Sequence, residues 1–231
     1  MMKTHYYFGW FNNIMPKQVG NSLNKDLADK KSLVMICTTP SDYKDNDSLS
    51  SWVKESWFES AGVVFDHYHS IDYRMKKEEA QKRLKNASAI LLHGGYPVSL
   101  KNFLAEYEMF EAIKSSEAAV IMGASAGGMN LGVKFAYENE GDNNHSEGLR
   151  LYDGLGLDDF AFTPHVARCV EALKQNERIQ ELIPLSQNIA VYAGCEESTI
   201  RVKSGKIEVM GDVFLIVNGE VQKVQESDFA E

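Results

Sequence analysis

The stretch AAVIMGASAGGMNLG, residues 118–132, has the pattern of a buried strand that ends in a tight turn and leads into a helix. Within it, GASAG at residues 123–127 has the spacing G-x-S-x-G, in which small neighbours let the backbone reverse and present a Ser hydroxyl at the edge of a sheet. Ser125 is therefore a candidate nucleophile. The alternative is that the glycines only allow close packing of strand against helix, with Ser125 as the helix N-cap.

Strand-like apolar segments and helix-like amphipathic segments alternate on the N-terminal side of this turn. This βαβ alternation predicts a mostly parallel sheet with helices on both faces, which is a three-layer α/β/α fold. Ligands bind such sheets beyond the carboxyl ends of the strands, so the glycines at 94–95 and 123–128 are expected at one edge. The strand-like segments are residues 32–38, 63–71, 89–95 and 118–123, and the helix-like segments are 48–61, 76–86 and 98–116.

The C-terminal quarter has a different pattern of apolar residues and turns. After residue 185, alternating apolar residues are separated by Ser-Gly and Asn-Gly, which are typical hairpin turns, so antiparallel strands are expected there. No repeat, low-complexity tract or Pro/Gly-rich linker divides the chain. Residues 1–231 are therefore predicted to form a single domain.

The composition narrows the setting. The chain has 231 residues, 44% of them hydrophobic, which is enough to bury a sizeable core. Its net charge is −9, so it lacks the basic surface that would bind a nucleic acid or an anionic membrane. No apolar run of about 18 residues could span a bilayer, and the N-terminus lacks a signal-peptide layout, so a cytoplasmic location is expected. Cys37, Cys169 and Cys195 form no disulfide or zinc pattern, and no metal or cofactor is predicted.

A Ser nucleophile needs a base, and His165 is the best candidate among six His residues. In LGLDDFAFTPHVARC it follows an apolar stretch and Pro164. The proline restrains the residue before it to an extended backbone, which would place the His165 side chain at the end of a strand. His93 precedes the glycine pair and could also approach the site. The others are His5, in an expected N-terminal extension, His67 and His69, in a strand-like run, and His145, in a polar loop.

Together, GASAGG, the earlier LLHGGY and the later GLGLDDFAFTPHV resemble motifs of the dipeptidase E and cyanophycinase group of serine peptidases. The likeness covers about residues 32–202. The resemblance implies a flavodoxin-like fold related to that of the class I glutamine amidotransferases. It also implies a Ser-His-Glu triad in which Ser125 is the nucleophile and His165 is the general base and then the general acid.

The third member of such a triad is harder to place, because GCEESTI contains two adjacent carboxylates. The family has a Glu shortly before a small polar residue and an apolar strand, and Glu197 fits that pattern better than Glu196. Strand alternation also places Glu197 on the more apolar face, together with Val191 and Cys195. We therefore expect Glu197 to orient the imidazole and Glu196 to be a solvated charge at the strand end. Glu140 and Asp142, in the loop after the nucleophile helix, remain alternatives for the acid.

The backbone around Ser125 offers two candidate oxyanion donors. Ala126 begins the departing helix, and Gly95 follows the neighbouring strand, where a glycine lets an N–H come close to a substrate. Gly94 and Tyr96 are expected to bind substrate, and Arg168 could bind a substrate carboxylate or form a surface salt bridge.

The same region departs from the resembled group. The chain reads Gly94-Gly95-Tyr96-Pro97 where the group commonly has Asn and Thr after the glycines, and Val166 follows His165 in place of Phe. Specificity for an amino-terminal aspartate or for cyanophycin is therefore not carried over to this chain.

The sequence thus predicts a serine hydrolase that cleaves an amide bond of a small peptide, as a dipeptidase or an isoaspartyl or aspartyl peptidase. The cysteine-nucleophile branch of the same fold is disfavoured, because Cys195 and Cys169 lie away from the Ser125 turn. The alternative from another class is a catalytically silent homologue that binds or senses a small molecule, suggested by the altered Tyr96-Pro97 loop. A homodimer is compatible with the sequence.

Overall fold

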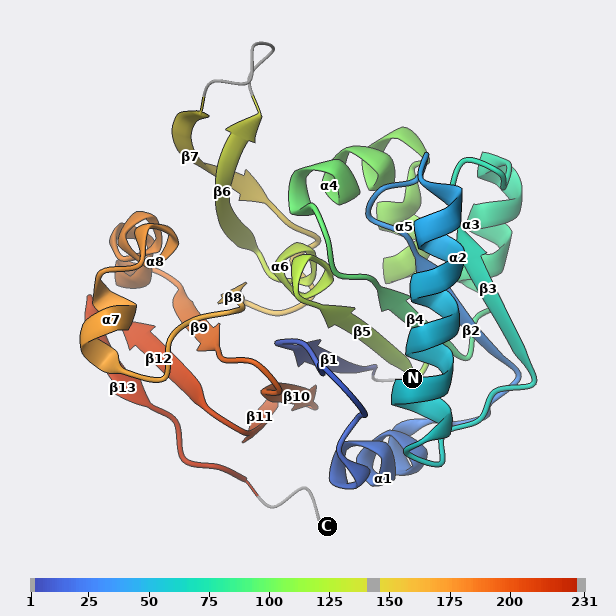
Figure 1. Ribbon diagram of the computed structural model, residues 1–231, viewed down its shortest axis with the longest axis horizontal. Helices are drawn as coiled ribbons and strands as arrows, with labels where there is room; N and C mark the ends of the chain where they lie inside the picture. The colour runs from blue at the N-terminus through green and yellow to red at the C-terminus, as the bar shows by residue number, and fades with distance from the viewer. Residues whose placement is uncertain (1–2, 141–145, 228–231) are drawn as a thin grey trace.

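A seven-stranded sheet forms the centre of the molecule, in the order β11-β10-β1-β5-β4-β2-β3 (Figure 1). The computed structural model describes residues 3–140 and 146–227. Strands β1 to β5 are parallel to their neighbours, whereas β10 and β11 are added antiparallel at the edge next to β1. The strands are β1 (Thr4–Phe8), β2 (Ser32–Ile36), β3 (His67–Ile71), β4 (Ala89–Leu92), β5 (Val120–Ala124), β10 (Thr199–Lys203) and β11 (Lys206–Met210).

Helices cover both faces of this sheet, because alternate residues of the central strands enter different cores. In β4, Ala89 and Leu91 join the core under α1 (Lys17–Asp26) and the π-helix η1 (Val53–Glu59), which continues α2 (Tyr43–Trp52). Ile90 and Leu92 join the core on the other face. The helices over that face are α3 (Lys77–Lys85), α4 (Pro97–Glu106), α5 (Met109–Lys114) and α6 (Ala126–Leu131). The predicted three-layer α/β/α fold is therefore confirmed.

The N-terminal segment is not an extension. Strand β1 lies between β5 and β10 in the middle of the sheet, and Tyr6, Tyr7 and Phe8 are fully buried. The expectation for His5 is therefore wrong, since its ring nitrogen Nδ1 lies 2.9 Å from Asp158 Oδ2 inside the fold. The sequence gives no local signal for this five-residue strand, because the strands with which it pairs are far away in the sequence.

Two predicted helices also differ in detail. The expected helix 98–116 is divided into α4 and α5 at Glu108, whose φ of 50° is left-handed. The expected helix 48–61 begins earlier, at Tyr43, because the side chain of Asp42 accepts a hydrogen bond from the Asp45 N–H and caps it.

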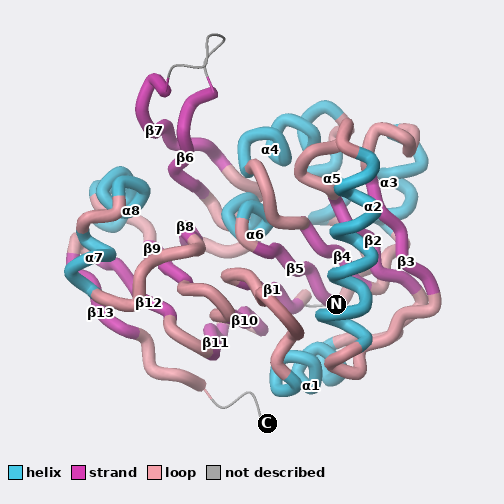
Figure 2. Tube along the Cα trace, viewed as in Figure 1, coloured by secondary structure: helices cyan, strands magenta, loops and turns pink. Residues whose placement is uncertain are grey.

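A second sheet, in the order β13-β12-β9-β8, lies beside the first (Figures 1 and 2). The predicted antiparallel C-terminal strands are present, with hairpin turns at Ser204-Gly205 and Asn218-Gly219, where all four residues have positive φ as type I′ turns require. The elements here are β8 (Phe160–Thr163), α7 (Val170–Lys174), α8 (Glu177–Leu182), η2 (Pro184–Gln187), β9 (Ala190–Gly194), β12 (Val213–Val217) and β13 (Glu220–Lys223).

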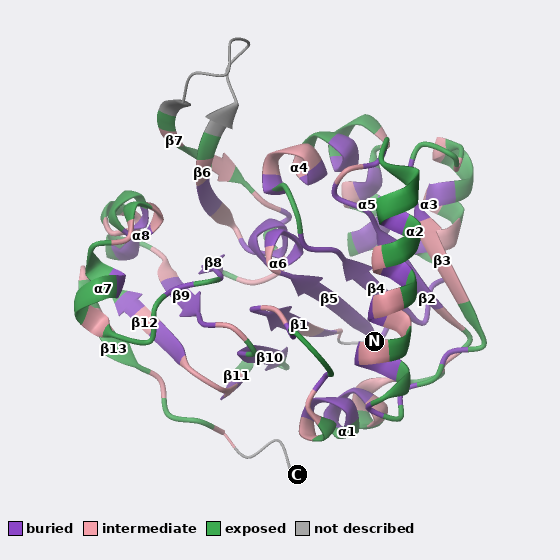
Figure 3. Ribbon diagram, viewed as in Figure 1, coloured by how far each residue is buried: buried purple, intermediate pink, exposed green. Residues whose placement is uncertain are grey.

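A two-stranded hairpin, β6 (Lys134–Glu140) and β7 (Ser146–Asp153), extends away from both sheets (Figure 1). Its base and the ends of the central strands are buried, whereas the outward sides of α2 and α3 are exposed (Figure 3). Within the described ranges, no helix has the length and apolar character needed to cross a bilayer.

Candidate active site

Ser125 occupies the sharp turn between β5 and α6. Its φ of 49° and ψ of −113° are unfavourable for a residue with a side chain, and the surrounding hydrogen bonds hold this conformation. The Ser125 N–H donates to the Phe8 carbonyl at 2.9 Å, and its own carbonyl accepts from the Met129 N–H at 3.0 Å. The side chain makes no capping hydrogen bond to α6. Ser125 is therefore the N-cap residue of α6 by position only, and its hydroxyl does not cap the helix.

The glycines around this turn have a packing role of their own. A Cβ on Gly127 would lie 2.0 Å from the Leu92 carbonyl oxygen, and a Cβ on Gly123 would lie 2.5 Å from the backbone of Gly127. Helix α6 therefore reaches β4 and β5 only without side chains at these positions. The small residues serve both packing and the exposure of the Ser125 hydroxyl.

His165 lies directly beside this hydroxyl. Its Nε2 is 2.6 Å from Ser125 Oγ, within hydrogen-bonding distance. His165 follows β8 and Pro164 and has a left-handed φ of 60°. The next residue anchors the loop, because the Val166 N–H donates to the Gly194 carbonyl at the end of β9. The structure thus brings together the two residues that the sequence paired.

The carboxylate beside His165 is that of Glu196. Its Oε1 lies 2.5 Å from His165 Nδ1, whereas Glu197 is exposed. The choice of Glu197 was wrong because strand alternation ends with β9 at Gly194. The chain then turns, with Glu197 at a φ of 62° and its N–H bonded to the Trp10 carbonyl at 2.8 Å, so it no longer points to the face that alternation assigns.

The other candidates for the base and the acid included His93, His145, Glu140 and Asp142. Asp142, His145 and the side chain of Glu140 lie outside the described residues. His93 is 1% exposed, and neither of its ring nitrogens has a hydrogen-bond partner in the described part of the chain. Burial lowers the pKa of the His93 imidazole to about 4, so the ring is neutral at pH 7.

The two backbone segments that carry the candidate oxyanion donors lie next to Ser125. Ala126 is the first residue of α6, so its N–H has no acceptor within the helix. Across from it, Gly94 lies so close that a Cβ there would be 3.4 Å from the Ser125 Cβ. Gly95 has a φ of 133°, and a Cβ on it would lie 2.2 Å from Thr38 Oγ1. Thr38 Oγ1 also donates to the Gly94 carbonyl at 2.8 Å and fixes the loop.

Ser125 and His165 open into a cavity of about 470 Å³, which Gly94 and Gly95 also line. Its apolar lining residues are Trp10, Leu49, Pro97 and Met129. The remaining lining side chains are Tyr137, from β6, and Arg178, from α8.

Arg178 is the functional candidate that sequence reasoning missed. Its guanidinium lies 5.2 Å from the centre of the Tyr137 ring, and no carboxylate of the described residues lies within salt-bridge distance of it. The signal available was Asn176, which caps α8 by accepting from the Ile179 N–H and so places Arg178 in the first turn.

Two residues expected to bind substrate lie elsewhere. Arg168 is exposed and pairs with Asp212 at 3.3 Å, which is the surface salt bridge given above as its alternative. Tyr96 is 55% exposed and does not line the cavity. Among the expected substrate-binding residues, only Gly94 faces it.

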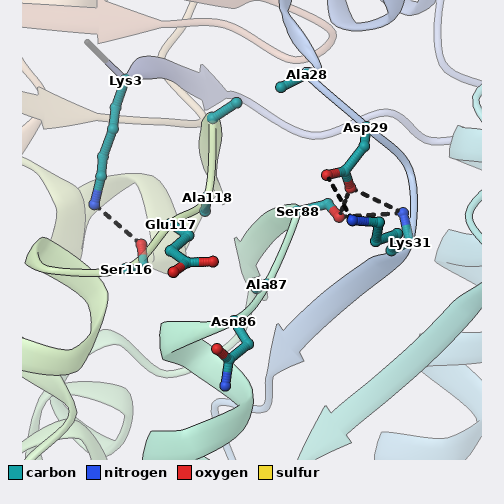
Figure 4. Close-up of a pocket in the computed structure, with 11 residues that line it drawn as sticks. Lys3, Ala28, Asp29, Lys31, Asn86, Ala87, Ser88, Ser116, Glu117 and Ala118 are labelled. Carbon is teal, nitrogen blue, oxygen red and sulfur yellow. Dashed lines mark hydrogen bonds and ion pairs between the residues drawn. The ribbon is translucent and has the colours of Figure 1, made fainter. Parts of the chain in front are cut away.

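A second cavity, of about 490 Å³, lies at the opposite end of the strands (Figure 4). It lies where β1, β4 and β5 begin, and several of its polar groups are already paired with each other. Lys3 Nζ donates to Ser116 Oγ at 3.0 Å, and Ser88 donates to Asp29. The cavity beside Ser125 is at the carboxyl ends of the parallel strands, where ligands bind in open α/β sheets, and it is the better candidate for a functional site.

This geometry defines the class of protein. It is an α/β protein in which a Ser, a His and a Glu contact one another in series beside a cavity at the edge of the sheet. Residues 16–210 match the model of peptidase family S51, and the chain belongs to this family of serine peptidases. The resemblance to the dipeptidase E group is thereby confirmed at the level of the family.

Solved structures agree on the fold. The crystal structure of a peptidase from an acI-B1 Actinobacterium is 17% identical, with a TM-score of 0.71 over 98% of this chain and 95% of that chain. The crystal structure of a "putative peptidase E protein" from Listeria monocytogenes EGD-e is 19% identical, with a TM-score of 0.63 over 91% of this chain and 98% of that chain. Comparison with curated proteins yields no significant match.

Proposed function

We propose that the protein is a serine peptidase that hydrolyses an amide bond of a small peptide through an acyl-enzyme on Ser125. The observation that carries the proposal is the continuous contact from Ser125 Oγ to His165 Nε2, at 2.6 Å, and from His165 Nδ1 to Glu196 Oε1, at 2.5 Å. Such an arrangement activates a hydroxyl, because the imidazole removes its proton while the carboxylate stabilises the imidazolium that forms. The turn at Ser125 acts as a nucleophile elbow.

The reaction proceeds in two halves. Ser125 Oγ attacks the amide carbonyl as its proton passes to His165 Nε2, and the N–H groups of Ala126 and Gly95 hold the oxyanion. His165 then gives that proton to the leaving amine, and the C–N bond breaks. In the second half, water gives a proton to His165 and attacks the ester. His165 then returns that proton to Ser125 Oγ as the C–O bond breaks, which releases the acid and restores the hydroxyl.

The position of Arg178 supports the proposal that the substrate is acidic. Its planar guanidinium faces the cavity of the nucleophile and can bind a carboxylate through two parallel hydrogen bonds. We therefore propose an aspartyl or isoaspartyl dipeptide or a similar small acidic peptide as the substrate class, with Arg178 in the role that the sequence suggested for Arg168. A cytoplasmic location is part of the proposal, supported by three cysteines that remain free.

Hydrolysis of a panel of aspartyl and isoaspartyl dipeptides tests the function. The wild type is expected to cleave at least one member, and Ser125→Ala to lose at least about a thousandfold in kcat, because residues that act as a unit fail together. A fluorophosphonate should label Ser125 in the wild type and not in His165→Ala. A folded wild type that neither cleaves nor reacts would instead support a catalytically silent homologue.

A further inference from the structure

The cavity beside Ser125 has two chemically different ends. Arg178 and Tyr137 come from α8 and β6, which pack against each other beyond one face of the central sheet. Trp10 and Leu49 come from the loop after β1 and from α2, and both pack on the core of the opposite face. Figure 1 shows α2 and α8 on opposite sides of β5 and α6, the two elements that Ser125 joins. A substrate at Ser125 therefore meets a cation on one side and an apolar wall on the other.

The indole of Trp10 is held rigidly by its neighbours. It stacks on Trp52, with ring centroids 5.9 Å apart and planes 19° apart, and meets the edge of Trp57 at 4.9 Å. Trp57 is fully buried and donates its indole N–H to the Phe11 carbonyl at 3.0 Å. An aromatic surface fixed in this way loses little conformational entropy when a ligand packs on it.

Trp10 also lies against the reacting region. A Cβ on Gly94 would be 2.6 Å from the Trp10 ring and 3.4 Å from the Ser125 Cβ, so the indole and the nucleophile both lie against this glycine. The Trp10 carbonyl accepts from Glu197, in the turn that carries Glu196. The ring is therefore positioned to contact a residue next to the bond under attack.

The wall has the chemistry of an apolar subsite. Trp10 and Leu49 carry no charged group and are only half-buried, so each has surface available for contact. Pro97 and Met129 add apolar lining to the same cavity from α4 and α6. A charged side chain placed there would lose hydration without gaining a partner. An aromatic or large aliphatic side chain would instead bury apolar area against the indole.

We propose that Trp10, with Leu49, determines specificity for a bulky apolar side chain on the substrate residue across the scissile bond from the acidic one. The inference rests on the proposed function and narrows its substrate class. The preferred substrates are small peptides that join an acidic residue to an aromatic or large aliphatic residue. The subsite is passive, and every chemical step is still performed by Ser125, His165 and Glu196.

Matched dipeptide pairs test this proposal: Asp-Phe against Asp-Ala, and Phe-Asp against Ala-Asp. In one of the two orders, wild-type kcat/KM is expected to favour the Phe peptide by about tenfold to a hundredfold, as pocket contacts of this size give. Trp10→Ala should bring that ratio close to one, mainly by raising KM for the Phe peptide, because the lost contact is made in ground and transition states alike. Trp10→Phe should keep most of the preference.

Two further variants guard against a general loss of structure. Leu49→Ala, at a half-buried position of α2, should lower the ratio in part while leaving the three indoles in place. Tyr43→Ala removes an exposed aromatic side chain from the same helix outside the cavity, and it should leave the ratio unchanged. Thermal unfolding of each variant shows whether the fold is intact.

Binding separates this inference from the proposed function. Calorimetry with Ser125→Ala measures the affinity of the same dipeptides without turnover and should show the same preference for Phe. Equal affinities, or a wild-type ratio that Trp10→Ala leaves unchanged, would overturn the subsite. Preferential binding of the Phe peptide with no cleavage by the wild type would refute the peptidase function and leave the subsite standing.

Discussion

His165 Nδ1 lies 2.5 Å from Glu196 Oε1, and this contact joins a loop after β8 to a turn after β9. The two segments start from neighbouring parallel strands, which run side by side and end at the same edge. The imidazole is thus oriented by a carboxylate whose turn is anchored to the Trp10 carbonyl, two residues after the Phe8 carbonyl that holds Ser125.

Replacement of this carboxylate should impair turnover. Glu196→Gln is expected to lower kcat by about a hundredfold to ten-thousandfold, because the imidazole loses the group that selects its tautomer and stabilises its charge. Glu197→Gln is the matched control and should stay within about twofold of the wild type, as exposed substitutions do. Steady-state kinetics on one cleavable dipeptide compares them. Equal losses in the two variants would contradict the placement of Glu196.

Removal of the positive charge of Arg178 from the cavity should change the substrate preference. Arg178→Met is expected to lower kcat/KM for an aspartyl peptide by about tenfold to a hundredfold, the strength of a hydrogen bond to a charged group, and to affect the asparaginyl analogue less. Arg168→Met removes an equal charge that pairs with Asp212 outside the cavity, and it should leave both substrates nearly unchanged. If Arg168→Met alone changes the preference, the assignment to Arg178 is wrong.

The loop after β4 should be intolerant of a side chain. Gly95→Ala places a Cβ against Thr38 at an unfavourable φ, so the loop must shift and displace a proposed oxyanion donor. The expected result is a loss of about a hundredfold to a thousandfold in kcat. Gly62→Ala is the control, because Gly62 also has a positive φ, of 74°, but open space around its Cβ position. It should lose some thermal stability and keep its activity.

The buried His93 should make the fold sensitive to mild acid. Burial lowers its pKa from 6.5 to about 4, so between these values the unfolded chain takes up a proton that the folded chain does not. His93 therefore does not lower the free energy of unfolding above pH 6.5, and it lowers that free energy by about 3 kcal/mol as the pH drops to 4.

His93→Leu should remove this component, which urea titrations at pH 7, 5.5 and 4.5 can measure as a flatter pH dependence of the unfolding free energy. His67→Gln, at an exposed position, should keep the wild-type slope. A slope that persists in His93→Leu would assign the acid sensitivity to other groups.

The sequence predicted those parts of the molecule whose signals are local. Ser125 lies in a five-residue motif that specifies its own backbone turn, and His165 follows a short strand and a proline that restrict where it can point. The alternation of strands and helices likewise indicated the parallel sheet. In each case, neighbouring residues carry the information.

The errors arose where geometry depends on distant partners. Strand alternation favours Glu197, but the end of β9 and the hydrogen bond to the Trp10 carbonyl impose a turn that exposes Glu197 and directs Glu196 to His165. Strand β1 was missed because its neighbours, β5 and β10, are far away in the sequence. Arg178 lies on a short surface-like helix, and only the position of β6 brings it to the cavity.

The central position of β1 has a consequence for how the chain folds. One neighbour of this strand, β5, is made in the middle of the chain, but the other, β10, comes near the end, and the turn that bears Glu196 directly precedes β10. Pairings of such long sequence separation form slowly and late. During synthesis on the ribosome, Ser125 and His165 emerge before the carboxylate and before the strand that completes the sheet. We therefore expect nascent chains to be inactive until the residues through β10 have emerged and this strand has paired with β1.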